Sequence, residues 1–140
     1  AAVIEFDYVD PAPDVMRALG LSPGEPAQRA ARVWSFDDKP FNYVTTYVPE
    51  SIGKAWTRTD MEVTPLAGLL ERSGVEVSLV RERVTATLTD THLSSYLGVE
   101  VGSPVLKIYR TAFDPAGRAV EYLIGFYRPD RYQYEVELPR

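Results

Sequence analysis

Apolar and polar residues alternate along several stretches of this chain, and a period of two is typical of β-strands with one buried face. Two gaps between these stretches, Asp37–Pro40 and Asp114–Gly117, hold turn-forming residues. Each gap therefore predicts an antiparallel hairpin between the stretches on either side. The predicted strands are residues 3–9, 30–36, 41–48, 75–88, 105–113, 119–127 and 132–138.

The longest of these stretches predicts a half-buried strand that carries one charge toward the core. Val80 and Val84 share one face of the strand, and Glu82 falls on that same face. A buried carboxylate without a partner is costly, so Glu82 needs one. Arg110, on an apolar face of a later strand, is the partner that we expect. Both a structural ion pair and a ligand contact are consistent with this pattern.

Apolar residues at helical spacing predict three short helices, each of which ends at a glycine. Asp14 is placed to cap the first helix, and Asp90 is placed to cap the third. The second helix should begin at Thr64 and Pro65, because proline suits the first helical position. Residues 50–62 follow no clear pattern and are expected to form an irregular loop. The predicted helix ends are Gly20, Gly74 and Gly98.

Strands joined by hairpins and interrupted by a few short helices predict an α+β fold with a mostly antiparallel β-sheet. The 140 residues fit one domain, which we expect to span residues 1–140. Hydrophobic residues make up 45% of the chain and charged residues 25%, a balance that favours a buried core over disorder.

Composition narrows the classes of function. The net charge of −5 opposes attraction to phosphates, so we do not expect this segment to bind DNA by itself. The absence of cysteine excludes disulfides and thiolate metal sites, and it fits a cytoplasmic location. No apolar run approaches the roughly 20 residues that cross a bilayer, so no membrane contact is expected. His92 is the only histidine, and we expect neither a metal nor a cofactor.

Two polar residues share one side of the strand predicted at residues 119–127. Glu121 and Tyr127 lie on the same face because strand side chains alternate with a period of two. The carboxylate accepts hydrogen bonds from hydroxyl or ammonium groups, and the phenol donates to an oxyanion. These side chains are therefore placed to address one ligand. The alternative is an exposed sheet face whose polar residues meet water.

Several short motifs follow one another in an order that is typical of a known family. The later ones are Leu97-Gly98-Val99, Gly102-Ser103-Pro104-Val105-Leu106, Asp114-Pro115-Ala116-Gly117-Arg118-Ala119-Val120-Glu121-Tyr122 and Tyr127-Arg128-Pro129-Asp130-Arg131-Tyr132. The earlier ones are Leu19-Gly20-Leu21, Gly24-Glu25-Pro26, Thr64-Pro65-Leu66 and Glu82-Arg83-Val84-Thr85-Ala86. In these motifs the chain resembles the UTRA domain, the effector-binding domain of GntR-superfamily transcription regulators of the HutC type.

The resemblance implies a chorismate-lyase-like fold, a small-molecule pocket and a homodimer. It also implies that a winged helix-turn-helix domain precedes the sensing domain in the intact regulator. We expect this chain to hold the sensing domain alone, so that DNA would be bound only through the missing N-terminal domain. The effector classes that the resemblance implies are an organic acid, an amino acid or a phosphosugar.

The resemblance further suggests which residues contact the effector. Glu121 and Tyr127 match pocket residues of sugar-sensing members. The family places an anion site at the helix start where Thr64 lies, with Arg32 as the facing cation, although a threonine there also serves as an ordinary helix cap. Thr46 lies where many members have an acidic residue. The candidate effector-binding residues are therefore Arg32, Thr46, Thr64, Glu82, Arg110, Glu121 and Tyr127.

The expected function is effector binding that modulates DNA binding by a winged-helix domain, without enzymatic activity. Two alternatives stay open at this point. A chorismate-lyase-type enzyme would use Glu82 or Glu121 as the proton donor and Arg110 or Arg32 to hold a substrate carboxylate. A dimerisation spacer would bind no ligand at all.

Overall fold

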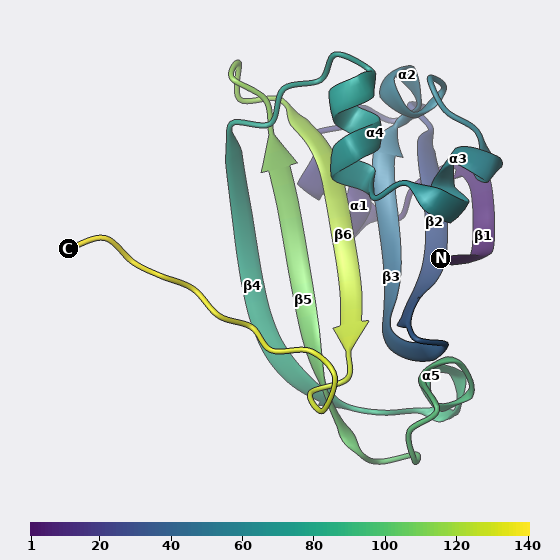
Figure 1. The fold of residues 1–140 in the computed structure, drawn as a ribbon. Coiled ribbons are helices and arrows are strands. Elements are labelled where there is room, and N and C mark those ends of the chain that lie inside the picture. The colour runs from purple at the N-terminus through teal and green to yellow at the C-terminus, as the bar shows by residue number, and fades with distance from the viewer.

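One six-stranded antiparallel sheet organises the chain in the computed structural model, which describes all 140 residues (Figure 1). The strand order is β1-β2-β3-β6-β5-β4, so β1 and β4 form the two edges. The α+β prediction with a mostly antiparallel sheet is confirmed. The strands are β1 (Ala2–Val9), β2 (Ala27–Phe36), β3 (Lys39–Pro49), β4 (Leu79–Leu88), β5 (Pro104–Phe113) and β6 (Ala119–Tyr127).

Both predicted hairpins are present, and local turn chemistry explains each of them. Asp37 and Asp38 adopt positive φ values of 50° and 61° between β2 and β3, a conformation that aspartate tolerates better than most residues. Between β5 and β6, the Asp114 carboxylate accepts hydrogen bonds from the backbone amides of Ala116 and Arg118. Gly117 supplies the positive φ of 82° that this second turn requires.

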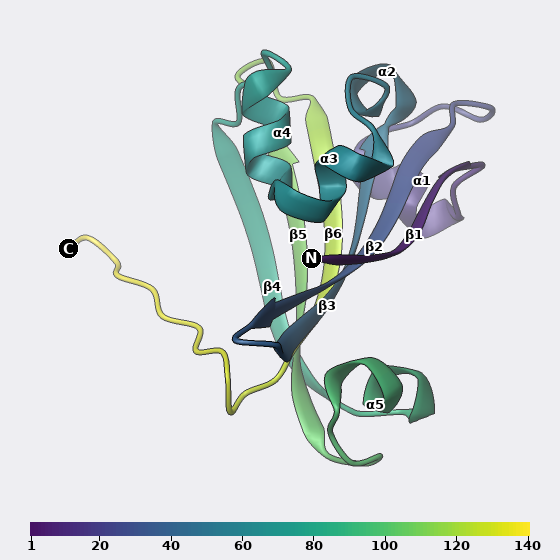
Figure 2. The same ribbon diagram turned by 45° about the vertical axis from the view of Figure 1, so that its right-hand side comes forward.

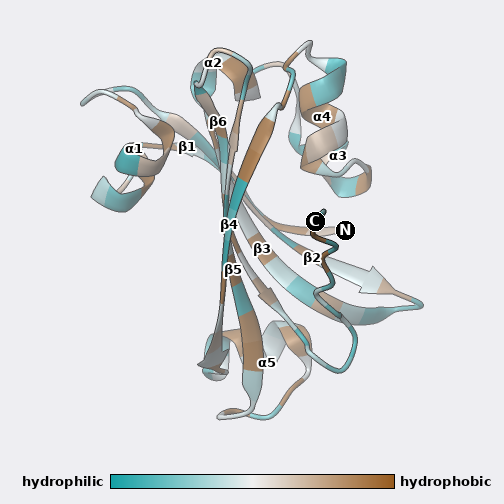
Figure 3. Cartoon of the chain, turned by 90° about the vertical axis from the view of Figure 1, so that its left-hand side faces the viewer, coloured by the Kyte–Doolittle hydropathy of each residue, from teal (hydrophilic) through white to brown (hydrophobic).

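Five short helices lie around the sheet rather than the three predicted. Figure 2 shows α3 and α4 above one face, and Figure 3, seen toward the β4 edge, places α1 on the opposite side. Helix α5 lies beyond one end of the sheet (Figure 1). The helices are α1 (Pro13–Leu19), α2 (Glu50–Gly53), α3 (Arg58–Val63), α4 (Leu66–Arg72) and α5 (Thr91–Leu97). No helix is both long enough and apolar enough to cross a membrane.

The prediction of an irregular loop over residues 50–62 is wrong, because α2 and most of α3 lie within it. Helix α3 begins with a capping box. The Thr57 hydroxyl accepts from the Asp60 amide at 3.4 Å, and the Asp60 carboxylate accepts from the Thr57 amide at 2.9 Å. Thr57 and Asp60 have the three-residue spacing of a capping box, which is visible in the sequence. A search for apolar periodicity does not detect this signal.

Of the three predicted helix caps, only Asp90 is confirmed. Its carboxylate accepts from the Leu93 amide at 2.8 Å, at the start of α5. Asp14 lies inside the first turn of α1 and makes no capping bond. Thr64 is the C-cap residue of α3, which ends at Val63, and it does not cap α4, which begins after Pro65 without any side-chain cap. The three glycines predicted at helix ends all have positive φ.

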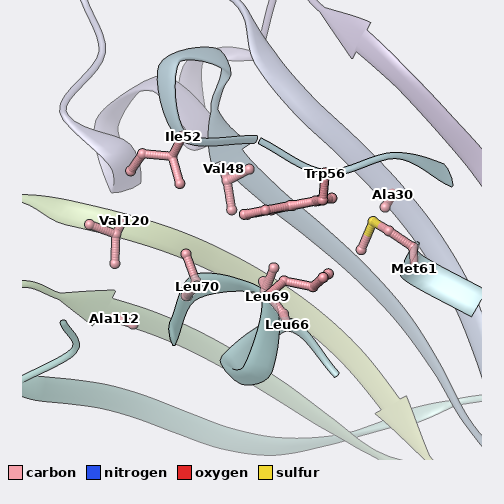
Figure 4. Packing of buried hydrophobic residues seen from close by; sticks show 10 residues of the cluster. All are labelled: Ala30, Val48, Ile52, Trp56, Met61, Leu66, Leu69, Leu70, Ala112 and Val120. Carbon is pink, nitrogen blue, oxygen red and sulfur yellow. The ribbon is translucent and has the colours of Figure 1, made fainter. Parts of the chain in front are cut away.

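The largest core cluster joins α3 and α4 to one face of the sheet (Figure 4). Leu69 and Leu70 of α4, with Met61 of α3, are almost fully buried against residues of β2, β3, β5 and β6. Burial of one such side chain contributes about 1.5–3 kcal/mol, so this cluster fixes α4 over the sheet. The cluster consists of Ala30, Val48, Ile52, Trp56, Met61, Leu66, Leu69, Leu70, Ala112 and Val120.

Two strand predictions need correction at the β4 side of the sheet. The long strand begins at Leu79, not at residue 75, and it is exposed rather than half-buried, with Val84 38% and Leu88 68% exposed. It is an edge strand that pairs only with β5, and no helix packs on most of its length. Residues 132–138 form no strand, since they lack any ladder partner in this chain.

Candidate functional site

A small hollow lies between the sheet and the start of α4. Its volume is about 180 Å³, and it takes side chains from β2, β3, β5 and β6. Five of the seven predicted site residues line it. The lining residues are Arg32, Trp34, Asn42, Val44, Thr46, Pro65, Leu66, Ala67, Arg110, Glu121, Leu123 and Tyr127.

Strand register brings these residues to one place. Leu123 of β6 lies opposite Thr46 of β3 and opposite Arg110 of β5. Because side chains alternate along each strand, Glu121 and Tyr127 share the face of Leu123. The prediction that these two side chains share one face is confirmed, and both are buried, which rules out the alternative of a solvated sheet surface.

Arg32 is a buried cation whose guanidinium is only partly bonded within the chain. Only 2% of the residue is exposed, and its Nη1 donates to the carbonyl oxygens of Met61 at 3.2 Å and Thr64 at 3.0 Å. Its Nε is buried without a partner. Burial lowers the pKa of Arg32 to about 10, so the side chain keeps its positive charge at neutral pH. The guanidinium also lies 5.2 Å from the ring centre of Trp34.

Glu121 is a buried carboxylate that no group of the chain neutralises by direct contact. The residue is 6% exposed and has no hydrogen bond or ion pair. Burial raises the pKa of Glu121, while the more distant charges of Arg110 and Arg32 act against that shift. The site thus holds an acidic group that is free to accept hydrogen bonds from a ligand.

Tyr127 is a buried residue in the wall of the hollow. Burial raises the pKa of its phenol to about 12, so the hydroxyl remains protonated and can donate. Tyr132 packs on its ring with centroids 4.4 Å apart. Gly125 leaves the room for this ring, since a Cβ there would lie 2.6 Å from a Tyr127 ring carbon. A glycine inside a strand was the available signal for this close approach.

Glu82 and Arg110 form the predicted ion pair, at 3.3 Å between Oε1 and Nε across β4 and β5. The second oxygen of Glu82 is buried and has no partner. A larger pocket of about 550 Å³ adjoins here and shares Arg110 and Glu121 with the hollow. Its walls also include Leu70, Val75, Val77 and Val80.

The two predicted threonines differ in position. Thr46 is buried and lines the hollow. Thr64 does not line it, because only its backbone carbonyl faces Arg32 and its methyl group points toward Gly68. Asn42 and Trp34 line the hollow but escaped prediction, although period-two alternation on β2 and β3 places them on the same faces as Arg32 and Thr46.

The chain contains no group of three or more metal-ligating side chains. His92 packs edge-on against Tyr43 and Tyr96. The polar groups of the hollow are therefore two cations, one carboxylate, one phenol and the small polar residues beside them. Together they can bind a small polar molecule by charge and hydrogen bonding.

Comparison with known proteins identifies the family of this chain. The family model described as the UTRA domain matches residues 1–133, and the chain belongs to this family. The predicted resemblance is thereby confirmed.

Two curated relatives are transcription regulators. The chain is 34% identical over 108 residues to the HTH-type transcriptional regulator Rv0792c of Mycobacterium tuberculosis, covering 74% of this chain and 40% of that protein. It is 21% identical over 132 residues to the HTH-type transcriptional repressor NagR of Bacillus subtilis, covering 94% of this chain and 54% of the repressor. The chain therefore spans about half the length of these relatives.

Solved structures share the fold over almost the whole chain. A ligand-binding domain assigned to a GntR-family transcriptional regulator of Bordetella bronchiseptica matches with a TM-score of 0.91 and 26% identity, covering 98% of this chain and 88% of the other. A protein of Streptomyces coelicolor, assigned as a transcriptional regulator, matches with a TM-score of 0.89 and 28% identity, covering 98% and 93%. The sheet and helices described above are thus those of a regulatory ligand-binding domain.

Proposed function

We propose that this chain is an effector-binding domain whose ligand occupies the hollow between β2, β3, β5, β6 and α4. The observation that carries the proposal is the convergence of Arg32, Glu121 and Tyr127, three buried polar side chains from two separate strands. Arg32 and Glu121 retain bonding capacity that the chain does not use. Buried polar groups are normally satisfied, so unused ones around a hollow indicate a bound partner.

The charges define the chemistry of the ligand. A carboxylate or phosphate oxygen accepts from Arg32 and from the phenol of Tyr127, while a hydroxyl or ammonium group donates to Glu121. An organic acid with hydroxyl groups, an amino acid and a phosphosugar each carry both kinds of group. The larger pocket beside Val80 gives room for the remainder of such a molecule.

Regulation follows if the ligand binds one arrangement of the intact regulator more tightly than another. The relatives are named as HTH-type regulators and extend beyond the aligned region. We therefore place DNA binding in a separate winged-helix domain, and we propose that two sensing domains associate as a homodimer. Because the named relatives are regulators, neither the lyase-type enzyme nor the ligand-free spacer is favoured.

A metabolite screen by thermal shift tests this proposal. A compound of the three classes above should raise the stability of the domain, by about 2.7 kcal/mol at 100 times its dissociation constant. At the same ligand concentration, Glu121→Gln and Arg32→Gln should each reduce this gain to about 1.4 kcal/mol or less, because 10-fold weaker binding leaves the ligand at only 10 times its dissociation constant. Arg83→Gln is the matched control, because its side chain lies over the Tyr109 ring outside the hollow. No response across all three classes, or full response in both hollow variants, would contradict the proposal.

A further inference from the structure

The larger pocket beside the hollow is acidic. It lies between α4 and strands β4, β5 and β6, and the segment that joins α4 to β4 forms part of its wall (Figure 1). Its charged residues are one arginine, Arg110, and four glutamates, Glu71, Glu76, Glu82 and Glu121. The pocket therefore repels an anion and attracts a cation.

Two of these glutamates have carboxylate oxygens that the chain leaves unsatisfied. Glu121 is 6% exposed and forms neither a hydrogen bond nor an ion pair. Arg110 pairs with one oxygen of Glu82, and the other oxygen, Oε2, is buried without a partner. Burial raises the pKa of Glu121, the charge of Arg110 acts against this increase, and the charge of Glu82 adds to it. Both carboxylates line the pocket, so a donor placed there can satisfy them.

The other two glutamates add negative charge on the solvent side of the pocket. Glu71 and Glu76 are exposed, and neither forms an ion pair. Exposed charges act over several ångströms and are screened by salt. They therefore attract a cation toward the pocket most strongly at low ionic strength.

Apolar side chains form the rest of the wall. Leu70 and Ala112 are buried there, and Val75 packs against the largest core cluster. Val77 and Val80 are 38% and 45% exposed. Hydrocarbon that covers these two valines removes apolar surface from water. The pocket thus fits a cation that is carried on an apolar chain.

A bare metal ion does not fit this distribution of charge. Metal sites gather three or more ligands about one point, and no such group of side chains exists in the chain. An ammonium group needs no complete shell of carboxylates. Its three donors suit the open oxygens of Glu82 and Glu121.

We propose that the effector carries a primary ammonium group at the end of an apolar chain, and that this pocket binds the ammonium group at Glu82 and Glu121. The inference rests on the proposed function, because the acidic group of the same molecule binds Arg32 in the adjoining hollow. Glu121 and Arg110 line both spaces, so one molecule can extend from one space into the other. Among the three classes named above, this selects an amino acid whose ammonium group is remote from its acid.

Three matched acids test the inference. The probes ω-aminohexanoate, ω-hydroxyhexanoate and hexanoate share one chain and one acid group, and they differ only at the far end. In isothermal titration, ω-aminohexanoate should bind about 10-fold or more tightly than either of the others, because hydrogen bonds between charged partners are the stronger ones. Equal affinities for the three acids, or no binding of ω-aminohexanoate at millimolar concentration, would overturn the inference. Either result leaves the hollow able to bind an effector without an amine, so the proposed function stands or falls by its own screen.

Two variants locate the ammonium group. Glu82→Gln and Glu121→Gln should each bring the ratio of the affinities for ω-aminohexanoate and hexanoate closer to one. The ratio is the readout because damage to the fold weakens the binding of both acids alike. An unchanged ratio in both variants would contradict the assignment of the ammonium group to this pocket.

Paired variants separate the pocket from the net charge of the domain. Glu71→Gln with Glu76→Gln should lower the same ratio by a smaller factor that disappears at high salt, because both side chains are exposed. Glu50→Gln with Glu100→Gln is the matched control, since it makes the same change in net charge at exposed residues outside the pocket. The control should keep the wild-type ratio. An equal decrease in the two paired variants would show that net charge alone sets the preference, and it would overturn the role of the pocket.

Discussion

Glu121 is the side chain that links the stability of this domain to its proposed ligand. It lies on the buried face of β6 without an ion pair, and it approaches Arg32 and Arg110 only at longer range. A carboxylate in such surroundings is costly for the empty protein. A ligand that supplies the missing hydrogen-bond donors would offset this cost.

Glu121→Gln should stabilise the empty domain at neutral pH. Because burial raises the pKa of Glu121, the folded domain binds this proton more tightly than the unfolded chain does. That contribution is present at low pH and is lost as the pH rises from the ordinary value of 4.5 through the raised pKa. Glutamine carries no such loss, so urea unfolding should show a difference between variant and wild type that grows with pH.

The same variant should bind the effector about 10-fold or more weakly, because a charge-assisted hydrogen bond contributes about 1.5–3 kcal/mol. Isothermal titration of the screen hit measures this loss. If the variant showed wild-type affinity and an unchanged pH profile of unfolding, Glu121 would have neither of the two roles assigned to it.

The Glu82 and Arg110 pair should add little to stability. Both side chains are partly exposed, so solvent screens their attraction. A double-mutant cycle with Glu82→Gln and Arg110→Gln should give a coupling energy of about 0.5–1 kcal/mol in urea unfolding. A coupling several times larger would mean that the pair behaves as a fully buried one.

At the scale of elements, α4 and β6 shape the hollow. Helix α4 supplies one wall, and its buried leucines hold it over the sheet. Strand β6 supplies Glu121 and Tyr127, with Gly125 between them leaving space for the phenol ring.

Leu69→Ala should loosen α4 and lower the free energy of unfolding by about 2–5 kcal/mol, because Leu69 is fully buried. Val63→Ala on the neighbouring helix is the control. Val63 is 76% exposed, and its replacement should change stability by less than about 0.5 kcal/mol. Similar losses in the two variants would contradict the packing described for α4.

Gly125→Ala should displace the Tyr127 ring and cost about 1–3 kcal/mol of stability, because the added methyl group overlaps a buried ring. Tyr127→Phe keeps the ring and should leave stability almost unchanged while it weakens ligand binding. Chemical denaturation and titration of both variants separate the packing role of the ring from the bonding role of the hydroxyl.

The sequence predicts the parts of the site that depend on neighbouring residues in the chain, and it does not predict the parts that depend on contacts between distant residues. Period-two alternation placed Glu121 with Tyr127, and it matched Glu82 with Arg110 across two strands. The burial of Arg32 depends on the α3–α4 junction, whose carbonyl oxygens bind it across the sheet, and nothing near Arg32 in the sequence indicates that contact. Thr64 was misplaced because a threonine followed by proline was interpreted as the start of a helix, whereas α4 begins at Leu66 with Pro65 as its N-cap residue.

At the scale of the whole molecule, the pattern of residues 75–88 predicted a half-buried strand and that of residues 132–138 a last strand, and the structure leaves both segments largely exposed. Alternation predicts the strand β4 correctly, but burial of its face depends on what packs over the edge of the sheet, and no pattern within the strand encodes that. The segment 132–138 has the period of a strand but no neighbouring strand in the chain to pair with.

The most direct test of the ligand-binding claim is a crystal structure of the domain with the compound found by the thermal-shift screen. The account predicts electron density in the hollow, with an acidic group of the ligand within hydrogen-bond distance of Arg32 and a donor group at Glu121. Density for the compound only at the outer surface, with the hollow filled by its own side chains, would contradict it.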